Sequence, residues 1–187
     1  MTATVRILTT GYAGDKVAST VTLIRDGAAA IVVDPGMVAD RELILGPLHK
    51  AGVGASAVTD VVFSHHHPDH TLNAALFTNA RFHDHWAVYK NDDWDDRDAD
   101  GFQVSEHVRL MRTPGHTAED ISTLVTTDEG LVVLTHLWWS ADGPADDPLA
   151  ADNDQLHRFR NAILELAPVR IIPAHGEPFT PTPETPR

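Results

Sequence analysis

Histidine is the residue type whose number and spacing in this sequence point to chemistry. The chain contains 12 histidines, and the neutral imidazole ring is a common metal ligand. Seven of them stand in four short segments, namely His65, His66, His67 and His70, then His116, then His136, and then His175. The first segment, Ser64 to His70, follows an apolar run directly, so its side chains can converge on one point in front of a sheet. The sequence therefore predicts a metal site built on histidine.

The absence of cysteine limits the kind of metal site. Without cysteine, thiolate zinc sites, iron–sulfur clusters, disulfides and thiol nucleophiles are all excluded. Any metal must then bind to nitrogen and oxygen. A set of ligands dominated by nitrogen favours zinc, as one or two ions, and is also compatible with iron or manganese, whereas calcium and magnesium prefer oxygen.

Three histidine motifs in a fixed order resemble those of the metallo-β-lactamase superfamily. They are the H-x-H-x-D-H pattern of residues 65–70, Thr113-Pro-Gly-His116-Thr and Ile172-Pro-Ala-His175-Gly, and they are preceded by Ile31-Val-Val-Asp34-Pro-Gly36. Each motif ends an apolar run, and together they span almost the whole chain. Residues 67–80 are also similar to a compact branch of this superfamily. The resemblance implies an α/β fold, the four-layer αββα sandwich.

The resemblance also implies two metal sites and a reaction. His65, His67 and His116 would hold the first metal, and Asp69, His70 and His175 the second, while His66 would point elsewhere as a hydrogen-bonded loop residue. A metal-bound hydroxide would then attack the substrate, because a bound dication lowers the pKa of its water toward neutrality. Asp69 could orient this hydroxide, and either His136 or His85 could protonate a leaving group.

His136 marks a departure from the family pattern. It stands in Leu134-Thr135-His136-Leu137-Trp138, where the family has a bridging aspartate. A carboxylate can bind two metals, whereas a neutral imidazole has one free lone pair. We expect weaker binding of the second metal unless His136 serves as its terminal ligand. Two alternatives remain open: Asp142 supplies the missing carboxylate, or His136 is a pocket residue that touches no metal.

Composition narrows the range of substrates. The formal net charge is −13, from 14 lysines and arginines against 27 aspartates and glutamates, so most of the surface would repel nucleic acid. The best candidate is a metal-dependent hydrolase acting on a small ester, thioester or lactone. The alternatives are a phosphodiesterase or nuclease of the same fold, and a non-catalytic metal or ligand-binding module. No signal-peptide pattern or membrane-spanning run is present, which predicts a cytoplasmic protein.

Hydrophobic periodicity predicts the elements that position these residues. A chain of 187 residues suits one domain, for which we expect residues 1–178, followed by a Pro/Thr-rich tail at 179–187. Strands are expected at 5–8, 18–25, 29–33, 58–63, 80–82, 104–111, 121–126, 131–134 and 169–172, with a turn at Asp26-Gly27. Helices are expected at 41–51, 72–77 and 152–166.

Three further features have weaker functional interpretations. His83 and His85 fall on one face of a strand end, where they line a pocket or lie on the surface. Residues 91–100 are acidic, and Asp96-x-Asp98-x-Asp100-Gly101 imitates the start of an EF-hand loop. The twelfth position of that loop is His107 instead of glutamate, so a solvated loop is preferred. Trp138 and Trp139 follow His136, and one of them could form a pocket wall.

Overall fold

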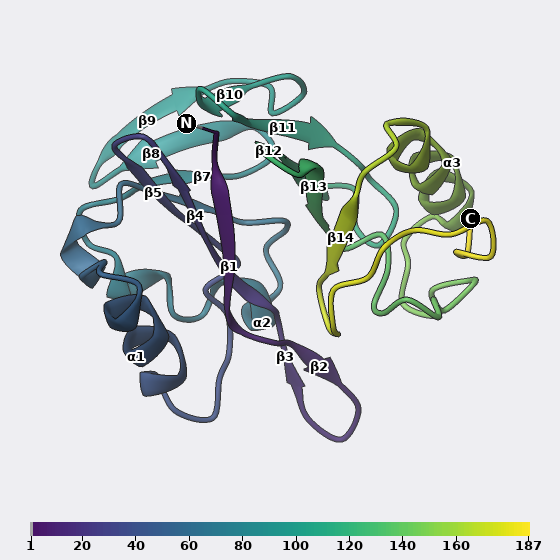
Figure 1. Cartoon of the computed structure of the whole chain (residues 1–187), viewed down its shortest axis with the longest axis horizontal. Helices are drawn as coiled ribbons and strands as arrows, with labels where there is room; N and C mark the ends of the chain where they lie inside the picture. The colour runs from purple at the N-terminus through teal and green to yellow at the C-terminus, as the bar shows by residue number, and fades with distance from the viewer. Residues whose placement is uncertain (1) are drawn as a thin grey trace.

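Two β-sheets pack face to face in the computed structural model, which describes residues 2–187 (Figure 1). The first sheet has seven strands in the order β1 (Thr4–Thr9), β4 (Val21–Asp26), β5 (Ala29–Val33), β6 (Asp60–Val62), β7 (Arg81–His83), β8 (Ala87–Lys90) and β9 (Asp93–Asp96). The second has five, in the order β10 (Gln103–Ser105), β11 (Val108–Arg112), β12 (Ile121–Thr127), β13 (Gly130–Thr135) and β14 (Arg170–Pro173). A small hairpin of β2 (Tyr12–Ala13) and β3 (Val17–Ala18) projects beside them.

Helices cover the outer face of each sheet. The helix α1 (Glu42–Lys50) packs Ile44 and Leu48 against the first sheet, and α3 (Asn153–Glu165) packs Leu156 and Ile163 against the second. Asp152 caps α3 by accepting a hydrogen bond from the backbone of Gln155 at 3.0 Å. This arrangement is the four-layer αββα sandwich expected from the sequence.

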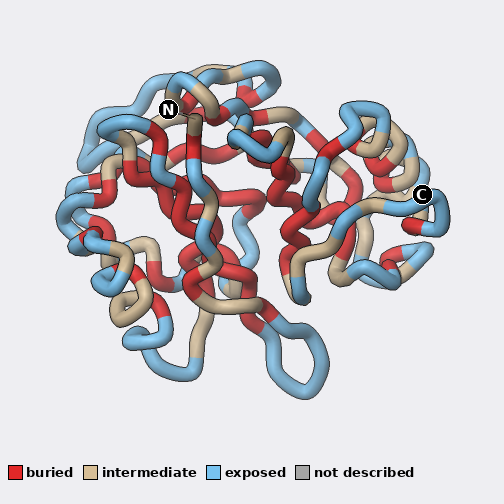
Figure 2. Tube along the Cα trace, viewed as in Figure 1, coloured by how far each residue is buried: buried red, intermediate tan, exposed pale blue. Residues whose placement is uncertain are grey.

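Both faces of the central strands are buried, which explains why their sequences are apolar runs rather than alternating patterns. In β5, Ile31 and Val33 face the second sheet, whereas Ala30 and Val32 lie under α1. Figure 2 shows the buried residues concentrated along the strands of both sheets, with exposed residues on the loops and helix surfaces. The site described below lies where such strands end.

The topology brings the ends of several strands to one edge of the sandwich. In the first sheet β5, β6 and β7 are parallel, and in the second β13 and β14 are parallel, with β11 running the same way. A backbone hydrogen bond from Ile121 to Ser64, 2.9 Å long, joins the end of β6 to the start of β12. Loops that follow strands of both sheets therefore meet at this edge.

Some predicted elements differ from those observed. The helix expected at 72–77 is wrong: α2 (Pro68–Thr71) begins earlier, and a 3₁₀ turn follows at Ala74–Leu76, after another at Ala55–Ala57. Proline is favoured at the first position of a helix, so Pro68 sets this start and places Asp69 and His70 on α2. The strand expected at 104–111 is divided into β10 and β11, while the turn at Asp26-Gly27 is confirmed.

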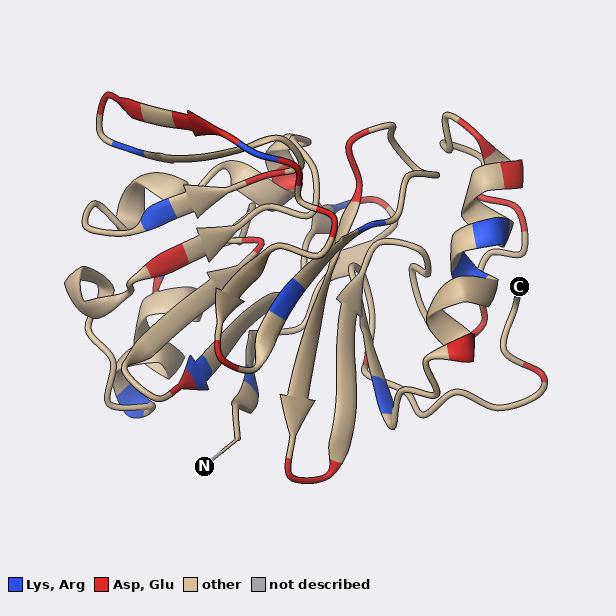
Figure 3. Cartoon of the chain, turned by 90° about the horizontal axis from the view of Figure 1, so that it is seen from above, with Lys and Arg blue, Asp and Glu red and all other residues tan. Residues whose placement is uncertain are grey.

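Residues 91–100 also differ from the solvated loop that was expected. Their first part forms β9, which pairs with β8 in an antiparallel hairpin, and Asn91 adopts a left-handed φ of 54° at the turn. Figure 3 shows acidic residues along this hairpin and on loops, with lysines and arginines scattered among other elements. Among residues 2–187, no helix combines the length and apolar character that a membrane span requires.

The end of the chain contacts the second sheet and α3. Phe179 pairs with Ile171 through two backbone hydrogen bonds, and Trp138 Nε1 donates to the carbonyl of Pro186 at 2.8 Å. Arg187 reaches Asn161 of α3. Trp138 is fully buried, so these contacts cover a core residue that stands two positions after His136.

Asp26 is the last residue of β4 and pairs with the first residue of β5. It links the two sheets at the edge of the sandwich that is opposite to the histidine motifs. Its carboxylate accepts hydrogen bonds from Ser105 Oγ at 2.6 Å and the His107 backbone at 2.7 Å, and contacts His107 Nδ1 at 2.8 Å. Burial raises the pKa of Asp26, but the hydrogen bonds from Ser105 and His107 outweigh this effect and lower it from 3.8. The ionised form is therefore the one that stabilises the fold.

We predict that Asp26→Asn lowers the free energy of unfolding by about 2 kcal/mol at pH 7, because charge-assisted hydrogen bonds are lost. A carboxyl whose folded pKa is lowered contributes stability above its unfolded pKa and loses it as the pH falls through the folded value. Urea denaturation of both proteins should therefore give a difference that is full at pH 7 and vanishes below pH 3.8. A difference that stays constant across this range would contradict the prediction.

Candidate metal centre

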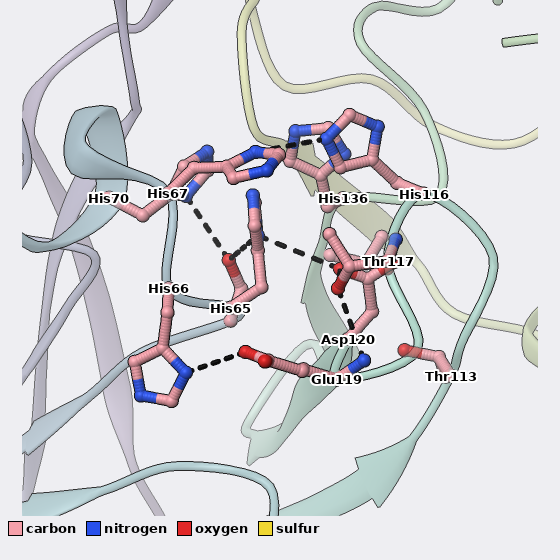
Figure 4. Close-up of polar contacts among 12 residues, drawn as sticks. His65, His66, His67, His70, Thr113, His116, Thr117, Glu119, Asp120 and His136 are labelled. Carbon is pink, nitrogen blue, oxygen red and sulfur yellow. Dashed lines mark hydrogen bonds and ion pairs between the residues drawn. The ribbon is translucent and has the colours of Figure 1, made fainter. Parts of the chain in front are cut away.

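The seven side chains predicted to ligate metal lie together at the edge where the strand ends meet, and Figure 4 shows His65, His67, His70, His116 and His136 among them. Ring nitrogens of His65, His116 and His136 lie within 4.8 Å of one another, and so do those of His70, His136 and His175. His67 and Asp69 complete the set: His67 Nδ1 is 3.3 Å from His116 Nε2, and Asp69 Oδ2 is 3.6 Å from His175 Nε2. His136 alone belongs to both groups, so it lies between the two predicted metal positions.

Buried carboxylates hold two of these imidazoles. Asp34, at the end of β5, accepts from the backbone of Ser64 at 2.7 Å and contacts His70 Nδ1 at 3.0 Å. Asp147 contacts His116 Nδ1 at 2.8 Å and accepts from Trp139 Nε1 at 3.1 Å. A carboxylate on one ring nitrogen turns the other nitrogen toward a metal and raises its basicity.

His175 is oriented by the backbone. Its Nδ1 donates to the carbonyl of Ala18, 3.0 Å away, and a carbonyl can only accept. The lone pair of His175 is therefore on Nε2, which lies 3.2 Å from Nε2 of His136. Two ring nitrogens at this separation require a proton or a metal ion between or beside them.

Buried ring nitrogens that lack a hydrogen-bond partner indicate that these residues are suited to bind a metal. Within residues 2–187, His65 Nε2, His70 Nε2 and His136 Nδ1 are buried without a hydrogen-bond partner. An unpartnered buried polar atom costs about 1–3 kcal/mol, and binding to a metal removes this cost. A donor set of several imidazoles and one carboxylate fits zinc and similar transition metals.

The protonation of the cluster is set by burial and by the neighbouring charges. Burial, followed by the charges of the neighbouring histidines, lowers the pKa of His65 and His136 well below 6.5. The same effects lower the pKa of His175 and that of the more exposed His67. These rings are thus neutral near pH 7, which is the form that binds metals.

His70 differs because it stands between two carboxylates. Burial lowers its pKa, but Asp34 and Asp69 outweigh burial and raise the pKa to about 9. Asp69 shows the complementary effect: burial raises its pKa, but the His70 ring, whose Nε2 lies 3.3 Å from Asp69 Oδ2, lowers the pKa by more. This part of the cluster therefore stabilises positive charge, whether a proton or a metal supplies it.

A cavity of about 130 Å³ opens beside the cluster. Four of its lining residues are the histidines 67, 116, 136 and 175, and Asp69 is a fifth. The remainder are apolar or aromatic: Ala13 from β2, Trp139, and Leu149 at the rim, which is 69% exposed. Trp139 thus forms a pocket wall, whereas Trp138 is a core residue.

Several other predicted residues lie elsewhere. Asp142 is exposed on its loop, away from both groups of ligands. His83 is fully buried and contacts Asp60 at 2.8 Å, so the surface interpretation is wrong for it. His85 lines a different cavity, together with Trp86 and Arg97, and not the cavity beside the histidine cluster.

Two carboxylates of the site were not predicted from the sequence. Asp147 lies on an irregular loop, far along the chain from His116, and no spacing pattern marks it. Asp120 accepts from the Thr117 backbone and hydroxyl at 2.7 and 2.8 Å and lies 3.6 Å from His65 Nδ1. Burial raises the pKa of Asp120 to about 6. Its place four residues after His116, in the same turn, is the signal that could have identified it.

Known proteins share this sequence pattern and fold. Residues 14–146 match the family model of the metallo-beta-lactamase superfamily. Metallo-beta-lactamase domain-containing protein 1 of Xenopus laevis is 33% identical over 94% of this chain and 80% of its own length, while the human protein of that name is matched over 59% of its length.

Two solved structures show the same fold. A metallo-beta-lactamase of Thermotoga maritima superposes with a TM-score of 0.76 at 21% identity, covering 97% of this chain and 100% of its own. An N-acyl homoserine lactone hydrolase with its product at the catalytic metal centre gives 0.60 at 16% identity, with 87% and 84% covered. With its αββα fold and its ordered histidine motifs, the chain belongs to the metallo-beta-lactamase superfamily and is a hydrolase of that superfamily.

Proposed function

We propose that this hydrolase uses zinc at the histidine cluster to cleave small carboxylic esters, thioesters or lactones. The observation that carries the proposal is the histidine cluster itself: three of its buried ring nitrogens lack a hydrogen-bond partner, and four of its histidines line a cavity with apolar walls. Bound zinc would supply a water of lowered pKa and would polarise the substrate carbonyl. The protein would supply the ligands, their orientation and the shape of the pocket.

The proposed ligand sets are those that the sequence motifs imply. His65, His67 and His116 would hold one ion, and Asp69, His70 and His175 the other. Asp147 and Asp34 would keep His116 and His70 turned toward the ions, because each holds the opposite ring nitrogen. Asp69 lies on the cavity wall, where its carboxylate can also accept a proton from the attacking water.

We assign His136 the role of a ligand rather than that of a proton donor. Burial and the neighbouring histidines lower its pKa, so its ring is neutral at pH 7 and a poor acid toward a leaving group. Its position in both groups of ring nitrogens supports the role of a ligand. The loss of the bridging oxygen is then compensated by one additional terminal nitrogen ligand.

The cavity favours a small uncharged acyl group. At about 130 Å³ it is smaller than the pockets of about 300–1,000 Å³ that enclose drug-sized ligands. Trp139, Leu149 and Ala13 provide apolar contacts, and no lysine or arginine stands among the described residues that line it. A phosphodiester would bring a negative charge to this wall, which offers no lysine or arginine to bind it in addition to the metal. The lactone-cleaving relative in fold supports the same class of substrate.

The test is a substrate screen on protein purified without chelators and reconstituted with zinc. We expect turnover of p-nitrophenyl acetate or butyrate, a thioester, or a small lactone, and its loss in His116→Ala but not in the surface variant His49→Ala. Cleavage of bis-p-nitrophenyl phosphate without esterase activity would instead identify a phosphodiesterase. Zinc binding without turnover of any carboxylic substrate would leave a non-catalytic binding module.

A further inference from the structure

His66 stands between two predicted metal ligands but points away from them. Figure 4 shows its ring on the opposite side of the loop from His65 and His67, facing Glu119. His66 Nδ1 lies 2.6 Å from Glu119 Oε2, and its Nε2 lies 3.4 Å from Asp84 Oδ2. The loop therefore directs His65 and His67 toward the metal cluster and His66 toward Glu119. The proposed reaction uses only the metal cluster.

A third side chain completes a cluster around His66. His85, half-buried after β7, offers a ring nitrogen within 4.8 Å of ligand atoms of His66 and Glu119. In the described chain its Nδ1 is buried without a hydrogen-bond partner, a property it shares with His65 Nε2 and His70 Nε2 of the main cluster. We propose that His66, His85 and Glu119 form an additional binding site for a divalent transition metal such as zinc.

Asp84 holds His66 in the way that other buried carboxylates hold ligands of the main cluster. Asp84 is 2% exposed, and one of its oxygens accepts from the backbones of Trp86 and Ala87 at 2.9 and 2.8 Å. Its other oxygen faces His66 Nε2. Nδ1 of His66 therefore faces Glu119 and can bind the metal. In the same way, Asp147 contacts Nδ1 of His116 and leaves Nε2 of His116 for a metal.

The geometry requires only a small adjustment to accept zinc. Ligands at about 2.0–2.1 Å from a tetrahedral zinc lie about 3.4 Å from one another. His66 Nδ1 and Glu119 Oε2 would separate from 2.6 Å to that distance. The His66 side chain is 40% exposed and that of Glu119 41%, so both can move without disturbing the core. Two imidazoles and a carboxylate, with a fourth position left for water, are a common zinc donor set.

The position of the site indicates what the metal would do there. His66 lies on the loop after β6, His85 on the loop after β7, and Glu119 on the loop that precedes β12. The first and third of these loops also carry His65, His67 and His116. A metal at the additional site would fix these loops relative to one another without entering the cavity, which makes its role structural. This inference does not depend on the proposed reaction.

Metal stoichiometry tests the proposal. Full-length protein is stripped with a chelator, titrated with zinc in competition with a chromophoric chelator, and its zinc content is measured by plasma mass spectrometry. We expect the wild type to bind one equivalent more than His85→Ala and one more than Glu119→Gln. We also expect the melting temperature of the wild type to rise when the additional equivalent of zinc binds. The melting temperatures of the two variants should not show this rise.

The matched control is His157→Ala. His157 also pairs with a carboxylate, its Nε2 lying 2.9 Å from Asp146 Oδ1, but it lies on α3 outside the groups of ligands. This variant should bind as many equivalents as the wild type. Equal stoichiometry in the wild type, His85→Ala and Glu119→Gln would overturn the proposal and leave His66 and Glu119 as an ion pair. A loss of one equivalent in His157→Ala as well would overturn it too.

Discussion

His136→Ala is expected to lower kcat/KM of the zinc-loaded enzyme about 1,000-fold and to reduce bound zinc by one equivalent. The side chain belongs to both groups of ring nitrogens, and its ring stacks on His116 with 4.0 Å between centroids. Its removal takes away a neutral ligand at the centre of the site. Stabilisation of transition-state charge by a metal is worth several kcal/mol, and about 4 kcal/mol corresponds to three orders of magnitude in rate.

The variant His136→Asp distinguishes a metal-binding role of His136 from a role in packing. A carboxylate restores the group that the family has at this position, so this variant should bind more zinc than His136→Ala and retain more activity. The surface variant His49→Ala should match the wild type in both measurements. Unchanged zinc content and unchanged kcat/KM in His136→Ala would show that the ring only fills space in the pocket.

Gly36→Ala is expected to have the largest effect on stability, lowering the free energy of unfolding by about 3 kcal/mol or more. A Cβ at Gly36 would lie 1.4 Å from the carbonyl oxygen of Asp69 and 2.6 Å from Ser19 Oγ. The Asp69 carbonyl is fixed by a hydrogen bond from the Ser19 backbone at 3.2 Å, so the start of α2 must move. Because α2 carries Asp69 and His70, zinc binding should weaken together with stability.

Gly54→Ala is the control for this prediction. Gly54 has an ordinary φ of −80° and ψ of 152°, and a Cβ there would meet no atom within 4 Å among the residues described. Its stability should equal or slightly exceed that of the wild type, by up to about 1 kcal/mol. Urea denaturation and zinc content would be measured for all three proteins. Equal values for Gly36→Ala and Gly54→Ala would refute the steric argument.

The sequence predicted the sandwich and the histidine cluster because both depend on short local patterns. Apolar runs marked β5, β6 and β12, and the motifs directly followed such runs. The geometry around Pro68 was predicted less well, because the preference of proline for the start of a helix was given too little weight against the apolar pattern of Leu72 to Phe77. As a result, Asp69 and His70 were expected on a loop and lie on α2.

The remaining errors concern residues whose partners are distant in the chain. Arg160 carries a charged side chain, a type that is almost never fully buried unless it is paired, yet it is fully buried and donates to the carbonyls of Leu137 and Pro144, both at 2.8 Å. β9 was missed because Asp93-Trp-Asp-Asp96 has no apolar face and is exposed throughout. Asp147 was missed because its role depends on the fold of the loop after β13. Such contacts leave no periodic trace in the sequence.

The residues at the rim of the cavity and the proposed metal ligands lie in different kinds of secondary structure. The ligands follow directly on core strands or lie on α2, where a change propagates into the sheets. Ala13 belongs to the projecting β2–β3 hairpin, and Leu149 is an exposed residue of the loop before α3. Substitutions at these two positions could therefore alter which acyl groups enter, whereas Asp147 of the same loop must stay because it holds His116. The fold thus allows substrate choice to change at two single positions while the reactive centre stays intact, and it offers the same two positions to the protein engineer.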